Sequence, residues 1–222
     1  MKKLFLLLFI ISVSLFGCEY FFPEEAELVE WQQDADGYSQ FRTNVDAVVG
    51  SLVLASLDGS LTQSSDFDYV AANIIKNSGN TLAPYGIVFG LDANNMSFYS
   101  LLINLEGDFI FVKYVNNTPS VLIPWTNVGD IISAETGAIN TLRVDYLGNN
   151  EFAITINDTE VTRVTEEEAP TLSGATGYAV AVAENEDFPD TPVDARFMQT
   201  YPEVSGTVTL RSLESSRILY NE

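Results

Sequence analysis

Apolar and polar residues alternate with a period of two from Trp31 onward, and turn residues interrupt this alternation at short intervals. Such alternation is typical of β-strands that bury one face. The segments that carry it most clearly are 67–75, 85–91, 109–115, 142–146, 152–156 and 161–164. About a dozen segments of this kind, without a long amphipathic helix, predict an all-β protein built as a sandwich or a barrel.

Four further segments refine this pattern. Residues 96–105 are apolar on both faces, which predicts a central strand that is covered on both sides. In residues 178–183 large residues alternate with alanines, and the small alanine side chains let another layer approach closely. Residues 195–199 predict a closing strand, and residues 207–210 predict a last strand before a weak tail.

Short polar segments predict the connections. Gly, Asn and Asp mark hairpin turns at 106–108, 148–150 and 157–158. The acidic segment 165–170 predicts a surface loop or one helical turn. Asp66 and Asp68 flank Phe67 at the start of a strand, where we expect them to solubilise a sheet edge.

The N-terminus has the composition of an export signal. Two lysines precede an apolar run, 4–11, that is too short to span a bilayer comfortably. Residues 15–18, Leu-Phe-Gly-Cys, resemble the lipobox of bacterial lipoproteins, although Phe16 is bulkier than the usual residue. This resemblance implies that residues 1–17 are removed and that a diacylglycerol is joined to the sulfur of Cys18. The alternatives are a plain signal peptide with an incidental cysteine, or an uncleaved anchor.

The lipobox resemblance also implies a location and an organisation. Glu19, and not Asp, follows the cysteine, which by the sorting rule of enteric lipoproteins implies the outer membrane of the bacterial cell envelope. The leaflet stays open. We expect residues 18–30 to form an acidic tether, residues 31–204 to form the sandwich, and residues 205–222 to form a C-terminal strand and tail.

Composition excludes several classes of function. The 222 residues include 31 acidic and 10 basic ones, so the net charge is −21, and such a surface repels nucleic acids. Histidine is absent, which removes imidazole general bases and histidine-ligated metals. Cysteine occurs once, so the chain can form neither an internal disulfide nor a thiolate metal cluster.

Three consecutive pieces between residues 84 and 164 resemble a known superfamily. They are YGIVFGLD with SFY (85–92, 97–99), GDFIFVKYV with IPWT (107–115, 123–126) and NTLRV with FAITIND (140–144, 152–158). In this order they are similar to the laminin-G-like, concanavalin A-like lectin/glucanase superfamily, with Asp158 where its pattern has glycine. The resemblance implies an antiparallel two-sheet β-sandwich of jelly-roll topology, in agreement with the strand count.

Glucanases of this superfamily carry acids in an E-x-D-x-x-E pattern along one strand, where one carboxylate attacks and another donates a proton. The nearest match is the pair Glu184 and Glu186, without a third acid in the right place. A solvated acidic turn is the interpretation that we favour for this pair. We therefore predict no catalytic residue and no enzyme activity.

Oxygen-rich loops offer the metal-ligating chemistry of this chain, and calcium is the ion that such ligands prefer. Asp34 and Asp36 lie in one such loop, and Asp92 and Asn94 lie in another. Neither loop completes a recognised calcium-loop pattern, and turn chemistry explains both. We predict no metal site and no cofactor, with calcium as the alternative.

Aromatic residues are the means by which a lectin stacks on sugar rings. Of the two tryptophans, Trp31 and Trp125, the second lies in the IPWT segment, and we expect it to pack inside the sandwich. Tyr99, Tyr114 and Tyr146 alternate with strand residues, which places them in the core or at its rim. No ligand-binding residue is predicted.

These observations favour a membrane-tethered, non-catalytic, lectin-like module of the cell envelope that binds a glycan or an envelope protein. One alternative is a polysaccharide-cleaving enzyme that uses Glu184 and Glu186. The other is a purely structural envelope lipoprotein. The expected partners are the membrane, through acylated Cys18, and the glycan or protein ligand, with no nucleic acid.

Overall fold

The computed structural model describes residues 29–33, 39–43, 52–55, 60–79, 81–92, 95–168, 170–181, 194–197, 203–212 and 218–219, with side chains for 67–79, 81–92, 95–168 and 170–180. The strands are β1 (Val29–Gln33), β2 (Ser39–Thr43), β3 (Leu52–Ala55), β4 (Ser60–Ser78), β5 (Tyr85–Asp92), β6 (Ser97–Ile103), β7 (Asp108–Val115), β8 (Thr118–Asn127), β9 (Ile139–Gly148), β10 (Glu151–Ile156), β11 (Thr159–Thr165), β12 (Gly174–Ala181), β13 (Asp194–Phe197), β14 (Glu203–Ser212) and β15 (Ile218–Leu219). A short 3-10 turn, η2 (Gly129–Ile131), follows β8. The predicted all-β class is confirmed. Within the described residues, no helix has the length and hydropathy of a membrane span.

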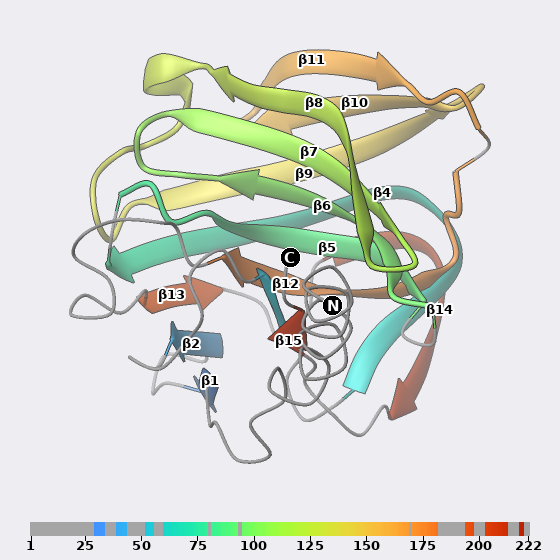
Figure 1. Ribbon diagram of the computed structural model, residues 1–222, viewed down its shortest axis with the longest axis horizontal. Coiled ribbons are helices and arrows are strands. Elements are labelled where there is room, and N and C mark those ends of the chain that lie inside the picture. The colour runs from blue at the N-terminus through green and yellow to red at the C-terminus, as the bar shows by residue number, and fades with distance from the viewer. Residues whose placement is uncertain are drawn as a thin grey trace, which may run out of the picture.

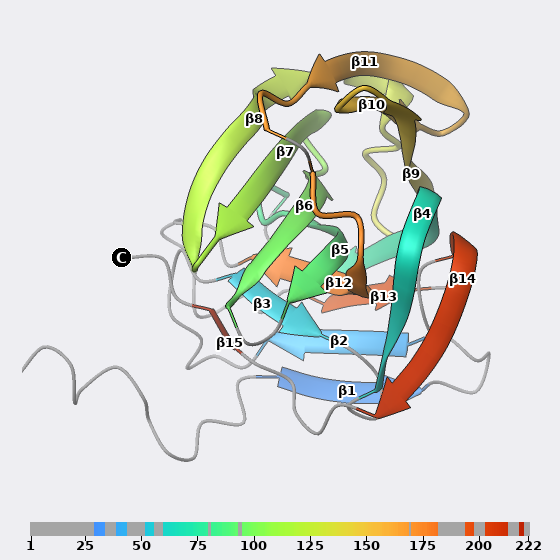
Figure 2. The ribbon, with the colours of Figure 1, turned by 90° about the vertical axis from the view of Figure 1, so that its right-hand side faces the viewer.

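Two antiparallel sheets face each other across the core (Figure 1, Figure 2). One runs β12-β5-β6-β7-β8, and the other runs β14-β4-β9-β10-β11. The long strand β4 pairs with β9 and β14 and, nearer its start, with β12, so it joins the two sheets along one side. β13, β2 and β1 continue from the far end of β4, while β3 and β15 follow β12. The predicted two-sheet jelly-roll sandwich is confirmed.

Two-residue turns close three hairpins, β7–β8, β9–β10 and β10–β11. Both central residues have positive φ in each turn: Asn116–Asn117 (50° and 63°), Asn149–Asn150 (52° and 63°) and Asn157–Asp158 (48° and 62°). Such pairs form type I′ turns, whose twist matches the twist of the flanking strands. Asp tolerates this left-handed backbone, so Asp158 serves where the superfamily pattern has glycine. The turns predicted at 148–150 and 157–158 are confirmed.

Aromatic rings from both sheets fill the middle of the core. Phe89 of β5 stacks on Tyr99 of β6, with ring centroids 5.2 Å apart and an interplanar angle of 12°. Phe111 of β7 lies 6.0 Å from Phe89, and Phe152 of β10, on the opposite sheet, lies 5.6 Å from Phe111. Aromatic pairs of this geometry add stability beyond the burial of their area, so these rings hold the two sheets together.

β6 is covered on both faces, as residues 96–105 predict. Tyr99, Leu101 and Ile103 belong to the core between the sheets. Phe98 and Leu102 point the other way, into a second buried cluster on the outer face of the β5–β8 sheet. The other members of this cluster are Val88, Val112, Tyr114 and Ala179. Ala179 of β12 is one of the small residues that we expected to admit another layer.

The strands near the C-terminus lie close to their predicted positions. β13 covers Asp194–Phe197, against the predicted 195–199, and the predicted strand 207–210 lies inside β14. β14 pairs with β4 from Glu203 onward and so runs across position 204, where we place the end of the sandwich. The division of the chain into leader, tether, sandwich and tail stays a prediction.

The side chain of Asp68 on β4 is exposed. On one side of β4 the pairing with β12 ends at Ser64 and the pairing with β9 starts at Tyr69, and on the other side Phe67 pairs with β14. The expectation that Asp68 solubilises a sheet edge stays a prediction. The side chain of Asp66 lies outside the described residues.

One cation is buried inside the sandwich. The side chain of Lys76 on β4 is 1% exposed, and its Nζ donates a hydrogen bond to the Ala83 carbonyl oxygen at 2.6 Å. Nζ also lies 5.7 Å from the ring centroid of Tyr85, whose hydroxyl accepts a hydrogen bond from Asn140. Burial disfavours the charged amine and lowers the pKa of Lys76 to about 7.

We expect the stability of the protein to depend on pH through Lys76. In the unfolded chain its pKa is 10.5, so between about pH 7 and pH 10.5 the unfolded state binds more protons and stability rises with pH. Below pH 7 both states are protonated, and the desolvation penalty is complete. Over this pH range the free energy of unfolding rises by at most about 5 kcal/mol, since one pKa unit corresponds to about 1.36 kcal/mol.

The variant Lys76→Met removes this titration and leaves the rest of the acidic chain unchanged. Urea unfolding at pH 6.5, 8.5 and 10 should show a stability gain with pH in the wild type that the variant lacks. Equal pH dependence in the two chains would contradict a buried, titrating Lys76.

Candidate functional site

The outer face of the β5–β8 sheet, which points away from the core, is organised in rows across the strands. The core side of β7 and β8 carries Phe109 and its partner Thr126, so their neighbours in sequence point outward. One outward row joins Leu102 and Ile110 to Trp125 at the β8 end. Further along the strands come Ser100, Val112 and Val121, and then Phe98, Tyr114 and Pro119.

Trp125 is exposed, so the prediction that it packs inside the sandwich is wrong. Its side chain is 47% exposed, and Val121 on the same strand is 54% exposed. Among the described strands β8 pairs only with β7, so a side chain on its outer face has a neighbouring strand on one side only. The pairing of β7 with β8 also shifts register between Phe109 and Phe111, opposite Trp125.

A row of polar side chains lies beside Trp125, across the ends of three strands. Asp108 of β7 is the cross-strand partner of Asn127, which lies two residues after Trp125 and therefore on the same face of β8. The Asp108 carboxylate accepts one hydrogen bond from Asn127 Nδ2 at 2.8 Å and one from Asn104 Nδ2 at 3.1 Å. Among the described residues, each oxygen of this carboxylate thus accepts one side-chain hydrogen bond, and a carboxylate oxygen can accept a second.

The turn between β6 and β7 holds this polar row in place. Asn104 Oδ1 accepts hydrogen bonds from the backbone N–H groups of Glu106 and Asp108, and Asn127 Nδ2 donates to the Glu106 carbonyl oxygen at 3.1 Å. Gly107 has a φ of +84°, and a Cβ there would lie 3.1 Å from the Gly129 carbonyl oxygen. Glycine at position 107 therefore allows the turn to pack against η2.

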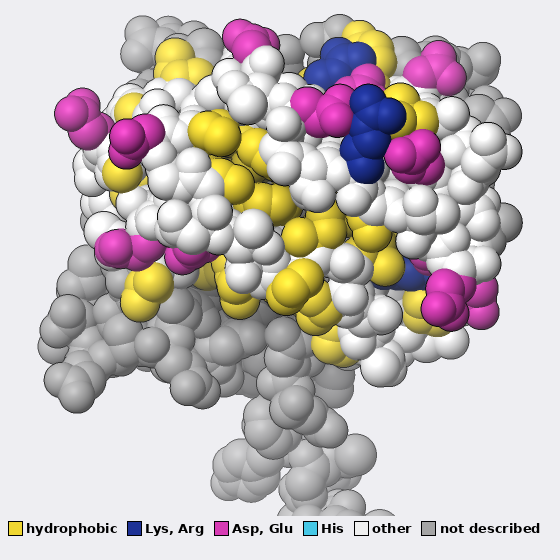
Figure 3. Space-filling model, turned by 90° about the horizontal axis from the view of Figure 1, so that it is seen from above, with side chains coloured by type: hydrophobic (Ala, Val, Ile, Leu, Met, Phe, Trp, Pro, Cys, Tyr) yellow, Lys and Arg dark blue, Asp and Glu magenta, His cyan; other side chains and the backbone are white. Residues whose placement is uncertain are grey.

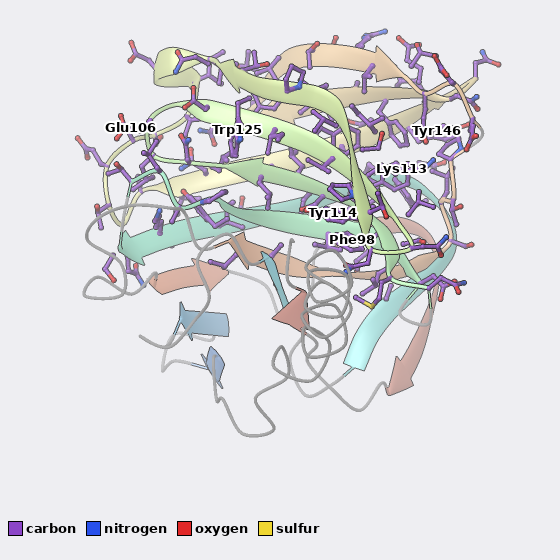
Figure 4. The ribbon with its side chains drawn as sticks, in the orientation of Figure 1. Phe98, Glu106, Lys113, Tyr114, Trp125 and Tyr146 are labelled. Carbon is purple, nitrogen blue, oxygen red and sulfur yellow. The ribbon has the colours of Figure 1, made fainter. Side chains whose placement is uncertain are left out.

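Trp125 and the polar row together form what we call the β8 platform: Trp125, Asn104, Asp108 and Asn127. In Figure 4, Trp125 and Glu106 lie toward one end of the β5–β8 sheet, while Lys113 lies toward the other end, on the same side of the molecule as Tyr146 of β9. An exposed indole offers a flat apolar surface, and the half-buried Asp108 carboxylate and the exposed Asn127 amide oxygen offer hydrogen-bond acceptors. Asn104 is buried and holds Asp108 in place. Such a combination suits a ligand with an apolar face and a polar rim.

The three tyrosines occupy the places expected of them. Tyr99 and Tyr114 are buried, and Tyr114 stacks on Phe98 with ring centroids 4.4 Å apart. Tyr146 is half-buried and packs against Phe152 at the rim of the core.

The sequence candidates for metal binding and catalysis fall largely outside the described residues. There lie Asp34, Asp36, Asn94, Glu184, Glu186, Cys18 and the side chain of Trp31. Asp92 is described, and its Oδ2 accepts a hydrogen bond from Asn95 Nδ2 at 2.8 Å, which is an interaction of a turn. The described residues contain no group of three or more acidic side chains that could hold a metal ion.

The acidic segment 165–170 leaves β11 as a loop in which Glu167 and Glu168 are exposed, as predicted, but Glu166 within it is buried. Its side chain is 6% exposed, and its carboxylate pairs with Lys113 Nζ of β7. Tyr99 donates its hydroxyl hydrogen to Glu166 Oε2 at 2.6 Å, and burial together with this carboxylate raises the pKa of Tyr99. Both carboxylate oxygens are thus engaged, which indicates a structural tie between this segment and the β5–β8 sheet.

Removing the cation of this pair should destabilise the fold. In Lys113→Met the Glu166 carboxylate stays buried without a counter-ion, and we expect a loss of about 3 kcal/mol in the free energy of unfolding. The double variant Lys113→Met/Glu166→Gln should recover much of this loss, because no buried charge remains. Urea unfolding measures both; a double variant less stable than Lys113→Met would contradict the buried ion pair.

The sequence and the fold were compared with known proteins. No protein-family model matches the chain, and a search of curated proteins finds no match. Solved structures do match. The carbohydrate-binding module CBM66 from Bacillus subtilis has a TM-score of 0.53 at 18% identity and covers 83% of this chain and 92% of the module.

Two further solved structures are similar. A β-glucanase from Bacillus licheniformis has a TM-score of 0.53 at 14% identity, covering 82% of this chain and 84% of the glucanase. A GH16 protein of a mixed-linkage glucan locus from Bacteroides ovatus has a TM-score of 0.51 at 11% identity, covering 81% and 86%. At these identities the likeness shows a shared fold, the concanavalin A-like jelly roll.

Proposed function

We propose that this chain is a membrane-tethered, non-catalytic glycan-binding module of the bacterial cell envelope. The observation that carries the proposal is the exposed Trp125 beside the row of Asn104, Asp108 and Asn127. A pyranose ring has an apolar C–H face that stacks on an indole and a rim of hydroxyls that needs donors and acceptors. The β8 platform supplies an exposed indole for this face and acceptors for these hydroxyls, where the ends of β7 and β8 lie beside the β6–β7 turn.

The chemistry of the platform and the likeness in fold support the same class of ligand. Trp and Tyr are favoured at binding surfaces because they bring a large rigid contact area with little loss of conformational entropy. The polar row is already held by its own hydrogen bonds, so ordering it on binding costs little. CBM66, a carbohydrate-binding module, has the same fold.

Removing the indole should abolish most of the binding. The mature chain with Cys18→Ser, which lacks the lipid, is passed over an array of polysaccharides and its affinity for the best polymer is measured by calorimetry. We expect Trp125→Ala to lower this affinity at least about tenfold, since truncation of an aromatic anchor costs on the order of 2 kcal/mol. Trp125→Phe should retain part of the affinity.

The matched control is Leu147→Ala. The exposed fraction of the Leu147 side chain, 46%, is nearly the same as that of Trp125. Leu147 lies on β9, in the other sheet. It should bind as the wild type does. Equal affinities for wild type and Trp125→Ala, or no binding to any polymer of the array, would contradict a glycan site at Trp125. Repeating the array with chelator tests the calcium alternative at Asp92 and Asn94.

The enzymatic alternative shares this fold, because two of the similar solved structures are a glucanase and a GH16 protein. It would use Glu184 and Glu186 as the carboxylate pair. Incubation of the chain with each bound polymer should release no reducing ends. If cleavage occurs and Glu184→Gln/Glu186→Gln abolishes it, the module is an enzyme.

The anchoring is proposed from the lipobox resemblance alone. Cells that express the full chain and are fed an alkyne-tagged fatty acid should label it, and Cys18→Ser should remove the label, because that sulfur is the only thiol of the chain. The labelled chain should fractionate with outer membranes. A chain that remains unlabelled while being exported would show a plain signal peptide with an incidental cysteine.

A further inference from the structure

The described surface offers very few cations. The residues with described side chains include four basic and thirteen acidic ones, a net charge of −9. Figure 3 views the molecule from above. On this face Lys and Arg appear in small groups beside acidic side chains, while hydrophobic side chains form a band across the middle. The position of each cation therefore decides whether a negatively charged ligand can find a partner.

Two of the four cations are lysines that are held inside the fold. Lys76 is 1% exposed and donates to the Ala83 carbonyl oxygen. Lys113 pairs with the buried carboxylate of Glu166 at the end of the sheet away from Trp125. Neither amine is available to a ligand on the outer face of β8.

The other two cations are arginines of the opposite sheet, and both are engaged by carboxylates. Arg143 of β9 donates to Asp145 through Nε at 2.8 Å, and its guanidinium lies 3.8 Å from the ring centroid of Tyr69. Arg163 of β11 donates through Nε and Nη2 to both oxygens of Glu160. These guanidinium groups therefore bind carboxylates of their own strands, β9 and β11, in the other sheet.

Within the described residues, the charged side chains that flank the β8 platform are all acidic. Asp108 lies in the polar row, Glu106 is exposed in the turn that carries it, and Asp130 is exposed in η2, three residues after Asn127. Thr81 donates its hydroxyl hydrogen to Glu106, so this carboxylate is held at the turn. An anion bound on Trp125 would meet these negative charges, and none of the four cations with described side chains would compensate them.

We infer that the site selects uncharged polysaccharides and rejects those that carry uronate, sulfate or phosphate groups. This inference rests on the proposed glycan-binding function and adds the charge class of the ligand. Carboxylates accept hydrogen bonds from sugar hydroxyls, and charge-assisted bonds of this kind are stronger than neutral ones. The same carboxylates repel an acidic sugar, so one set of side chains gives both affinity and discrimination.

The test uses matched pairs of polymers. The mature chain with Cys18→Ser is titrated with neutral glucans, mannans and fructans and with the C6-carboxylated form of each polymer, at low and at high salt. The neutral form should bind at least about tenfold more tightly at low salt, and added salt should narrow this ratio because it screens the repulsion.

Charge reversal locates the source of the discrimination. Asp130→Lys should raise the affinity for the carboxylated polymers. Glu168→Lys makes the same change of charge at an exposed position of the segment that contacts Lys113, and it should leave both affinities as they are. The inference is overturned if the wild type binds the carboxylated form as tightly as the neutral form, or more tightly. If Trp125→Ala still lowers the affinity in that case, the proposed function stands. Binding to neither form of any polymer overturns both.

Discussion

The aromatic packing around Phe89 determines which side of the β5–β8 sheet faces the core, and the outer face follows from that choice. Phe89 and Phe111 of this sheet meet Phe152 of the opposite sheet. Because side chains alternate along a strand, a shift of one residue would exchange the two faces. With the rings inside, Trp125 and Asn127 point outward beside Asp108. The candidate site is therefore the reverse side of the core packing.

Burial along the outer row changes in steps from the middle of the sheet to its edge. Leu102 is buried, Ile110 is half-buried and Trp125 is exposed, because β8 pairs with β7 alone among the strands that the structure describes. An edge strand thus lets the sheet carry a large aromatic surface into water without disturbing the core. The polar row beside it is fixed by hydrogen bonds to the β6–β7 turn, so a ligand meets a surface that is already ordered.

Local patterns predict the strands, the two-sided burial of 96–105 and the turns at 148–150 and 157–158, because each depends on residues that are neighbours in sequence. The exposure of Trp125 depends instead on the place of β8 at the edge of the described sheet, which no local pattern contains. The burial of Glu166 depends on partners 67 and 53 residues away. The fold follows from the sequence, whereas the candidate site needs the arrangement of strands that the folded chain provides.

The most direct measurement of a glycan site at Trp125 is its fluorescence. The chain has two tryptophans, so Trp31→Phe leaves Trp125 as the sole indole emitter. Titration with the polymer that binds best should shift this emission to shorter wavelength, and the shift should saturate over the same concentrations as the calorimetric heat. Saturable binding with an unchanged emission would place the glycan elsewhere on the molecule and would contradict the β8 platform as the binding site.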